Sequence, residues 1–274
     1  CDSSPVVDKN DADTQSGNVG TIHPEIWPKQ ASPFALNERL EQRVTDLVNK
    51  MSLEEKVGQT IQADIGSITP VQVREYHLGS VLNGGNSAPG GDNRTTPAAW
   101  VALADEFWLA STDKTDGRIG IPALWGTDAV HGHNNIVGAT LFPHNIGLGA
   151  ANNPALMHRI GTVTAKEILV TGLDWTFAPT IAVVRDDRWG RTYESFSEDP
   201  AIVRAFAGNL VEGLQGKIDD GTFLDEDHLI ATAKHFIGDG GTVDGRDQGD
   251  NISSEEDLRD IQGAGYPVAI NRGV

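Results

Sequence analysis

The stretch Ala233-Lys234-His235-Phe236-Ile237-Gly238-Asp239-Gly240-Gly241 joins a cation and an imidazole to a glycine-rich run. It directly follows the segment 228–232, which is mostly apolar. An apolar run of this length, ended by polar side chains and glycines, predicts a short buried strand that leads into a loop. We therefore expect Lys234 and His235 to stand together where that strand ends.

Two further segments repeat this arrangement. Residues 121–128 are largely apolar and end at Asp128, with His131-Gly132-His133 close behind. Residues 173–179 run into Arg185-Asp186-Asp187-Arg188-Trp189-Gly190-Arg191. Strands that end in charged residues are typical of an α/β barrel, whose active site is built at the carboxyl ends of its strands. The three loops are expected to meet at one edge of a parallel sheet.

Helix and strand signals alternate along the chain from residue 36. Helical spacing and capping signals predict helices over 36–50, from Ser52, over 97–111, 153–171 and 200–214, and from about residue 254. Short apolar runs predict strands near 59–63, 80–82, 123–127, 173–178 and 229–233. This order is typical of an α/β fold with a parallel sheet. The absence of a Gly-x-Gly-x-x-Gly pattern and of a phosphate-binding loop argues against a nucleotide-binding fold.

About five strands are predicted, whereas a closed (β/α)8 barrel needs eight. A parallel sheet with an uncovered open edge is unfavourable. The sequence therefore predicts a TIM-like barrel that is truncated after about five strands. We expect residues 33–274 to be the N-terminal portion of that barrel in a longer protein, or else to pair with a second chain.

Composition excludes several classes of partner. The 274 residues carry a formal net charge of −18, which repels phosphates, so we expect no nucleic-acid partner and no binding to an anionic membrane surface. The sequence contains no run of about 18 apolar residues, so no membrane-spanning helix is predicted. The only cysteine is Cys1, which excludes an intrachain disulfide.

The first residues carry a signal of location. A chain that starts with Cys1 instead of Met suggests the removal of a leader, and Cys1-Asp2-Ser3-Ser4 resembles the mature start of a bacterial lipoprotein, whose cysteine carries the lipid. An arbitrary start of the sequence is the alternative. Residues 1–32 are rich in Asp, Ser, Asn and Gly and predict a flexible tether. The first interpretation predicts a periplasmic or other extracytoplasmic location, with a lipid anchor at Cys1.

Five motifs, taken together and in order, resemble glycoside hydrolase family 3, particularly its β-glucosidase and glucan exohydrolase branch. They are the segments 126–132, 139–145, 177–179, 187–196 and 234–241. Each alone is weak evidence, whereas the set is specific and covers roughly residues 36–274. The resemblance implies a TIM-like barrel followed by a second α/β domain, and neither a cofactor nor a metal.

The resemblance also implies a sugar site. Residues that match Asp128, Arg191, Lys234 and His235 bind the terminal sugar ring in this family. A pyranose presents hydroxyls that donate to carboxylates and accept from cations, and such charge-assisted bonds are strong and directional. Glu194 is expected to orient Arg191 or Lys234. The alternatives are a surface ion pair of Arg191 with Glu194 or Asp187, and a structural role for His235.

The reaction implied is hydrolysis of terminal non-reducing β-D-glucosyl residues from β-glucosides or β-glucan oligosaccharides. It proceeds with retention, by two carboxyl groups about 5–5.5 Å apart. In this family the Asp nucleophile lies in a Ser-Asp-Trp or similar motif on a later strand, and the Glu acid/base usually lies on the following domain. No Ser-Asp follows Lys234. No catalytic residue is therefore assigned in this chain, and both are expected beyond Val274.

Three other interpretations stay open. The β-N-acetylhexosaminidase branch of the same family shares the Lys-His-Phe-x-Gly-x-Gly motif but supplies a catalytic His in the next loop, and residues 242–248 contain none. A non-catalytic carbohydrate-binding protein is implied if the chain really ends at Val274. His131, His133 and His144 could suggest zinc, but their spacing is weak evidence for a metal site.

Overall fold

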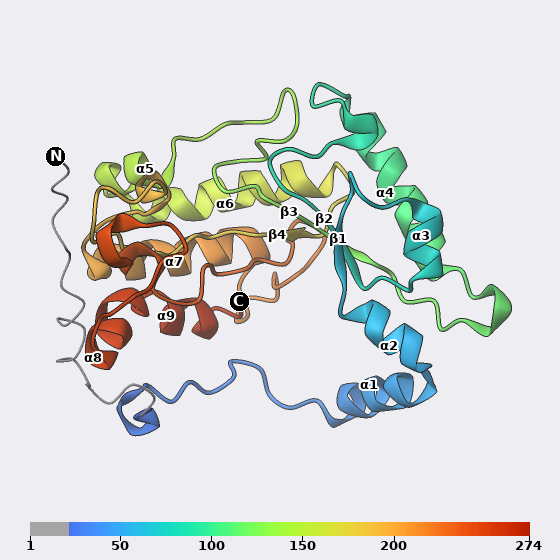
Figure 1. Ribbon diagram of the computed structural model, residues 1–274, viewed down its shortest axis with the longest axis horizontal. Coiled ribbons are helices and arrows are strands. Elements are labelled where there is room, and N and C mark those ends of the chain that lie inside the picture. The colour runs from blue at the N-terminus through green and yellow to red at the C-terminus, as the bar shows by residue number, and fades with distance from the viewer. Residues whose placement is uncertain (1–21) are drawn as a thin grey trace, which may run out of the picture.

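Four short parallel strands form the centre of the fold, in a computed structural model that describes residues 22–274 (Figure 1). Strands β1 (Gln62–Asp64), β2 (Ser80–Asn83), β3 (Leu124–Thr127) and β4 (Trp175–Thr176) lie in the order β1-β2-β3-β4. Each strand pairs in parallel with the next, so that Val81 stands opposite Ala63 on one side and Trp125 on the other. The predicted α/β fold with a parallel sheet is confirmed.

A fifth segment continues the sheet beside β4 without forming a regular strand. Ile230 and Lys234 form isolated parallel bridges with Trp175 and Thr180. The Lys234 amide donates to the carbonyl oxygen of Pro179 at 3.0 Å. The strand predicted at 229–233 therefore lies in the expected place but forms only bridges. The strand predicted at 173–178 is shorter than expected and consists of β4 alone. Pro179 interrupts the ladder because it has no amide hydrogen.

Helices alternate with these strands. The longer ones are α1 (Glu38–Lys50), α4 (Pro97–Thr112), α6 (Pro154–Leu169) and α7 (Pro200–Gln215), and the shorter ones are α2 (Leu53–Gln59), α3 (Pro70–Glu75), α5 (Asn145–Ala151), α8 (Glu255–Asp257) and α9 (Tyr266–Asn271). The capping signals predicted two of the starts. Ser52 and Glu55 form a reciprocal capping box at α2, and the Asn153 side chain accepts from the Leu156 amide at α6.

Some predicted boundaries are wrong. The first strand begins at Gln62 and not at residue 59, because α2 continues through Gln59. Helices α3 and α5 were not predicted at all, since each is under eight residues long and too short to show a helical period. The start predicted near residue 254 is confirmed, since Ser254 is the N-cap of α8, which is followed by one turn of π-helix at Leu258–Gln262 and by α9.

Close helix packing forms much of the core. Helices α6 and α7 lie side by side on one flank of the strands (Figure 1). A Cβ at Gly213 would lie 2.2 Å from the carbonyl oxygen of His158, so glycine permits this approach. One buried cluster includes Met157, Phe206, Val211 and Leu214; a second, around β2 and β3, includes Val81, Trp100, Phe107 and Trp125.

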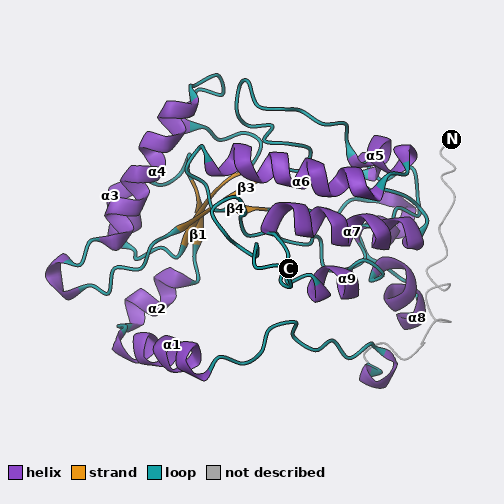
Figure 2. Ribbon diagram, turned by 180° about the vertical axis from the view of Figure 1, so that it is seen from behind, coloured by secondary structure: helices purple, strands orange, loops and turns teal. Residues whose placement is uncertain are grey.

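The sheet does not close into a barrel within residues 22–274, as predicted for a truncated TIM-like barrel. Helices α1 and α2 lie apart from α6 and α7 in both views (Figures 1 and 2). The segment before α1 runs along the chain's C-terminal elements, where the Trp27 indole donates to Glu255 at 2.6 Å. In this part of the chain, no helix is long and apolar enough to span a membrane. Cys1 and most of the predicted tether lie outside the described residues.

Candidate active site

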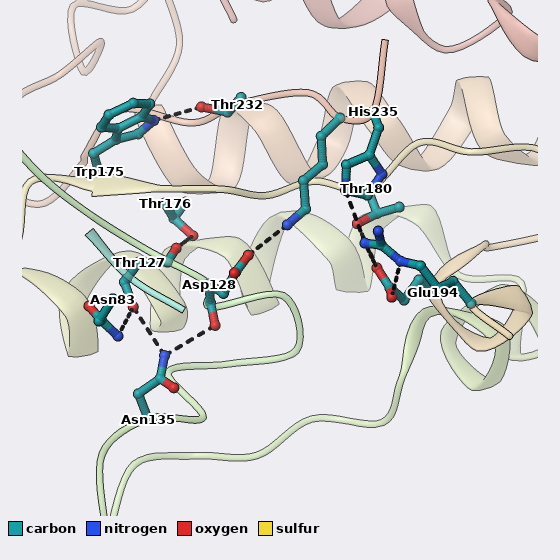
Figure 3. Close-up of polar contacts among 12 residues, drawn as sticks. Asn83, Thr127, Asp128, Asn135, Trp175, Thr176, Thr180, Glu194, Thr232 and His235 are labelled. Carbon is teal, nitrogen blue, oxygen red and sulfur yellow. Dashed lines mark hydrogen bonds and ion pairs between the residues drawn. The ribbon is translucent and has the colours of Figure 1, made fainter. Parts of the chain in front are cut away.

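The loops that follow β3 and the fifth segment bring Asp128 and Lys234 together. Asp128 is the first residue after β3, and Lys234 is the last bridged residue of the fifth segment. The Lys234 Nζ donates to Asp128 Oδ1 at 2.7 Å (Figure 3). The Lys234 side chain is 15% exposed and that of Asp128 is 37% exposed. The cation is largely enclosed, whereas the carboxylate is partly exposed, and its Oδ2 accepts no hydrogen bond from the described residues.

Arg191 lies in the loop after β4 and holds two of the other predicted residues. Its Nε donates to Glu194 Oε1 and its Nη2 donates to Glu194 Oε2, both at 2.7 Å. The same Nη2 is 2.9 Å from His235 Nε2. The bidentate geometry matches a guanidinium to a carboxylate. Glu194 is buried, so this is not the exposed surface pair considered as an alternative. The orienting role expected for Glu194 stays a prediction.

A buried polar layer supports Asp128 from inside the sheet. The Asn83 amide donates to Thr127 Oγ1 at 2.9 Å, and the Asn135 amide donates to the same oxygen at 3.0 Å. Asn135 also donates to the backbone carbonyl of Asp128 at 3.2 Å (Figure 3). Buried polar groups are stable only when they are paired. These bonds therefore fix the backbone from which the Asp128 carboxylate projects.

The charges of the site are balanced in pairs. Burial opposes ionisation of Glu194, but the hydrogen bonds and the charge of Arg191 outweigh it, and the pKa of Glu194 lies below its ordinary value. The hydrogen bond to Glu194 raises the pKa of Arg191. Asp128 is similarly paired with Lys234. The two cations Lys234 and Arg191 are thus each paired with one carboxylate.

The three histidines considered for zinc have other contacts. The rings of His131 and His144 stack with their centroids 4.1 Å apart. The His133 ring is fully buried, and its Nε2 is 3.0 Å from Thr171 Oγ1. No group of three His, Cys, Asp or Glu side chains with metal-binding spacing occurs in residues 22–274.

Sequence reasoning missed two residues of this constellation, Asp239 and Asn135. Asp239 Oδ2 lies 2.8 Å from His235 Nδ1, on the opposite side of the imidazole from Arg191. The signal was present, because Asp239 stands four residues after His235 in the glycine-rich run. Asn135 was also missed, and it carries no signal, since it lies in a loop without periodicity. The structure brings all five predicted site residues into one connected region, while their roles toward a sugar stay predictions.

Comparison with known families decides the identity of this fold. Residues 52–274 match the model of the glycosyl hydrolase family 3 N-terminal domain. The chain belongs to glycosyl hydrolase family 3. The predicted family is therefore confirmed.

Solved and curated relatives agree with this family. A crystal structure of an exo-1,3/1,4-beta-glucanase from a Pseudoalteromonas species is 55% identical, with a TM-score of 0.87, and the match covers 90% of this chain and 31% of that one. The lysosomal beta glucosidase of Dictyostelium discoideum is 31% identical over 221 residues, which are 75% of this chain and 27% of the relative.

Two bacterial relatives extend the range of names. The periplasmic beta-glucosidase of Salmonella typhimurium is 29% identical over 209 residues, 74% of this chain and 24% of the relative. A putative beta-xylosidase of Formosa agariphila is 32% identical over 220 residues, 75% of this chain and 27% of the relative. All these names belong to glycoside hydrolases. The chain spans about a quarter to a third of the length of these relatives.

Proposed function

We propose that the protein hydrolyses terminal non-reducing β-D-glucosyl residues of β-glucosides or β-glucan oligosaccharides, with retention at the anomeric carbon. The observation that carries this proposal is the paired arrangement of Asp128 with Lys234 and of Arg191 with Glu194 at the carboxyl edge of the sheet. The family membership and the 55% identity to an exo-1,3/1,4-beta-glucanase support it.

The ion pairs are suited to hold a sugar ring. Asp128 Oδ2 is an acceptor for hydroxyl protons, and Lys234 donates beside it from an enclosed position. Two neighbouring hydroxyls distant from the anomeric carbon fit this pair, because each can donate to the carboxylate and accept from the ammonium. An epimer would leave one of these charged groups unpaired and would be rejected.

The two catalytic carboxyl groups are proposed to lie outside this segment. We propose that residues 33–274 are the N-terminal portion of a barrel that further strands complete, with a second α/β domain beyond it. The open sheet and the exposed apolar side chains of α1 support this. So does the greater length of the relatives. A retaining mechanism then places an Asp nucleophile and a Glu acid/base about 5–5.5 Å apart across the sugar held here.

The β-N-acetylhexosaminidase alternative gains no support from the loop that would carry its catalytic histidine. Residues 242–250 contain no histidine and pack against the loop after β4. There Asp247 accepts from the Trp189 indole at 3.0 Å. A Cβ at Gly245 would meet the Trp189 backbone nitrogen at 2.5 Å. This loop supplies no general acid of the histidine type.

Aryl β-glycosides assayed with the full-length protein test the proposal. We expect hydrolysis of the β-glucoside with release of glucose, slower hydrolysis of the β-xyloside, and no hydrolysis of the N-acetyl-β-glucosaminide. Proton NMR should detect β-glucose as the first product. Appearance of α-glucose first would exclude retention, and binding of glucan without any hydrolysis would favour a carbohydrate-binding protein.

Location outside the cytoplasm is part of the same proposal. The periplasmic relative from Salmonella typhimurium supports it. A lipid on Cys1 is a separate proposal that rests on the sequence of the first four residues alone. Intact mass of the mature protein would detect the lipid.

A further inference from the structure

Asp239 faces the imidazole of His235 from the side opposite to Arg191. Its Oδ2 is 2.8 Å from His235 Nδ1, and its side chain is 20% exposed. Gly238, with φ at +104°, turns the chain back, so that Asp239, four positions after His235, meets the imidazole ring. The backbone beyond is clamped, because the Arg185 amide donates to the Gly240 carbonyl at 2.8 Å. Asp239 is thus held in place independently of His235.

The two partners of His235 together determine where its proton lies. The guanidinium of Arg191 can only donate, so the His235 Nε2 at 2.9 Å from Nη2 must be an acceptor without a proton. The carboxylate of Asp239 can only accept, so Nδ1 must carry the proton. A single tautomer of the neutral ring satisfies both contacts. The opposite tautomer would set two N–H groups against each other at Arg191.

This assignment changes the expected role of His235. The sequence suggested a group that binds hydroxyls beside two cations, without a direction for its hydrogen bonds. In the fixed tautomer, Nε2 is an acceptor. Its single lone pair takes the hydrogen bond from Arg191, so the ring acts on the sugar site through the guanidinium. Arg191 Nη2 in turn contacts both His235 and Glu194. A change in the tautomer or orientation of the His235 ring would therefore displace the guanidinium.

We propose that Asp239 is a positioning residue, which fixes His235 in the Nδ1-protonated form and thereby aligns Arg191 in the sugar site. The consequence for catalysis rests on the proposed glycosidase function, whereas the tautomer itself does not. An orienting carboxylate beside a histidine is a general device for selecting the tautomer that a reaction needs.

Neutron diffraction from crystals of the full-length wild-type protein tests the tautomer directly. We expect deuterium on Nδ1 of His235 and none on Nε2. Deuterium on Nε2 of a neutral ring would overturn the proposal. This measurement requires no substrate and no variant, so it decides the inference even if the protein proves inactive on β-glucosides.

Asp239→Asn tests the consequence for activity. The amide can donate to Nδ1 and so favours the wrong tautomer, and we expect kcat/KM for the aryl β-glucoside to fall roughly 10- to 100-fold, as for other orienting partners. Asp244→Asn is the matched control: it lies in the next turn, forms an exposed ion pair with Arg188 at 3.2 Å, and has φ at +58°, which asparagine tolerates.

The control should stay within about twofold of wild type, as expected for an exposed pair. An Asp239→Asn enzyme as active as the control would overturn the positioning role. If wild type itself fails to hydrolyse any glycoside, the proposed function fails, and the neutron result still stands for or against the tautomer.

Discussion

At the scale of single residues, the Asp128 carboxylate is divided between two tasks. Oδ1 accepts from Lys234, whereas Oδ2 accepts no hydrogen bond from the described residues and is proposed to bind the sugar. An ionised carboxylate can accept at both oxygens, whereas an amide must donate on one side. The type and approximate place of Asp128, Arg191, Lys234 and His235 were predictable from strand ends and motifs. Their pairing was not, because which cation meets which carboxylate depends on the register between segments that lie far apart in the chain.

Asp128→Asn is therefore expected to lower kcat/KM for the β-glucoside by roughly 10- to 200-fold, from the loss of a charged hydrogen bond of about 1.5–3 kcal/mol. Glu194→Gln, which disturbs only the carboxylate that contacts Arg191, should lower kcat/KM by nearer 10- to 100-fold. These ranges overlap, so the decisive measurement uses a deoxyglucoside that lacks the hydroxyls assigned to Asp128. Asp128→Asn should penalise that poor substrate little further. An equal loss on both substrates would show that Asp128 is structural.

His133 gives a prediction for pH. Burial lowers its pKa from 6.5 to about 4 in the folded protein, and its Nε2 faces Thr171 Oγ1, which donates its own proton to Ile168. In the unfolded chain His133 binds a proton near pH 6.5, whereas in the folded chain it stays neutral until the pH falls toward 4. The stabilising contribution is thus present above pH 6.5 and is lost as pH falls toward 4.

Between about pH 7 and pH 4, this group should remove up to about 3 kcal/mol of unfolding free energy from wild type. His133→Gln keeps a donor for Thr171 and cannot titrate. Denaturant unfolding at the two pH values should therefore show a smaller acid loss for the variant. Equal acid losses in both proteins would mean that His133 titrates normally in the folded state.

At the scale of elements, local signals predicted best where they are strong. Helices α1, α4, α6 and α7 follow clear periodicity or capping, and their bounds lie close to those predicted. Strands were harder, because β4 and the fifth segment are shaped by their neighbours and by Pro179 more than by their own residues. Helix α5 is stabilised by docking, since a Cβ at Gly149 would lie 1.7 Å from the Phe196 carbonyl oxygen. Such tertiary contacts leave no local pattern.

Two glycine-to-alanine substitutions separate helix propensity from helix packing. Gly213→Ala in α7 places a Cβ 2.2 Å from a carbonyl oxygen of α6 and should destabilise by about 1–3 kcal/mol, as overpacking does. Gly147→Ala in α5 meets nothing closer than 3.4 Å and should stabilise by up to about 1 kcal/mol. Thermal unfolding of both variants checks the signs. A neutral Gly213→Ala would mean that α6 and α7 have room to separate.

At the scale of the whole molecule, the count of strands predicted that the barrel would be open, and the structure agrees within residues 22–274. What the sequence could not predict is which faces remain uncovered, because that depends on how far the sheet curls. The apolar stripe of α1 is one such face. Leu40, Val44 and Leu47 line a surface groove there and are each more than a third exposed.

The α1 stripe provides a test of the proposed barrel in the full-length protein. If further barrel elements cover it, Leu40→Glu combined with Leu47→Glu should lose the burial of two leucines and place two charges in an apolar interface, a cost of about 3 kcal/mol or more. Val71→Glu on α3, where the side chain is 72% exposed, is the matched single-site control and should shift unfolding little. The comparison is thermal unfolding of the three full-length proteins. If the double variant unfolds like the control, the α1 stripe faces water in the whole protein, and the proposal that residues 33–274 form one part of a closed barrel is wrong.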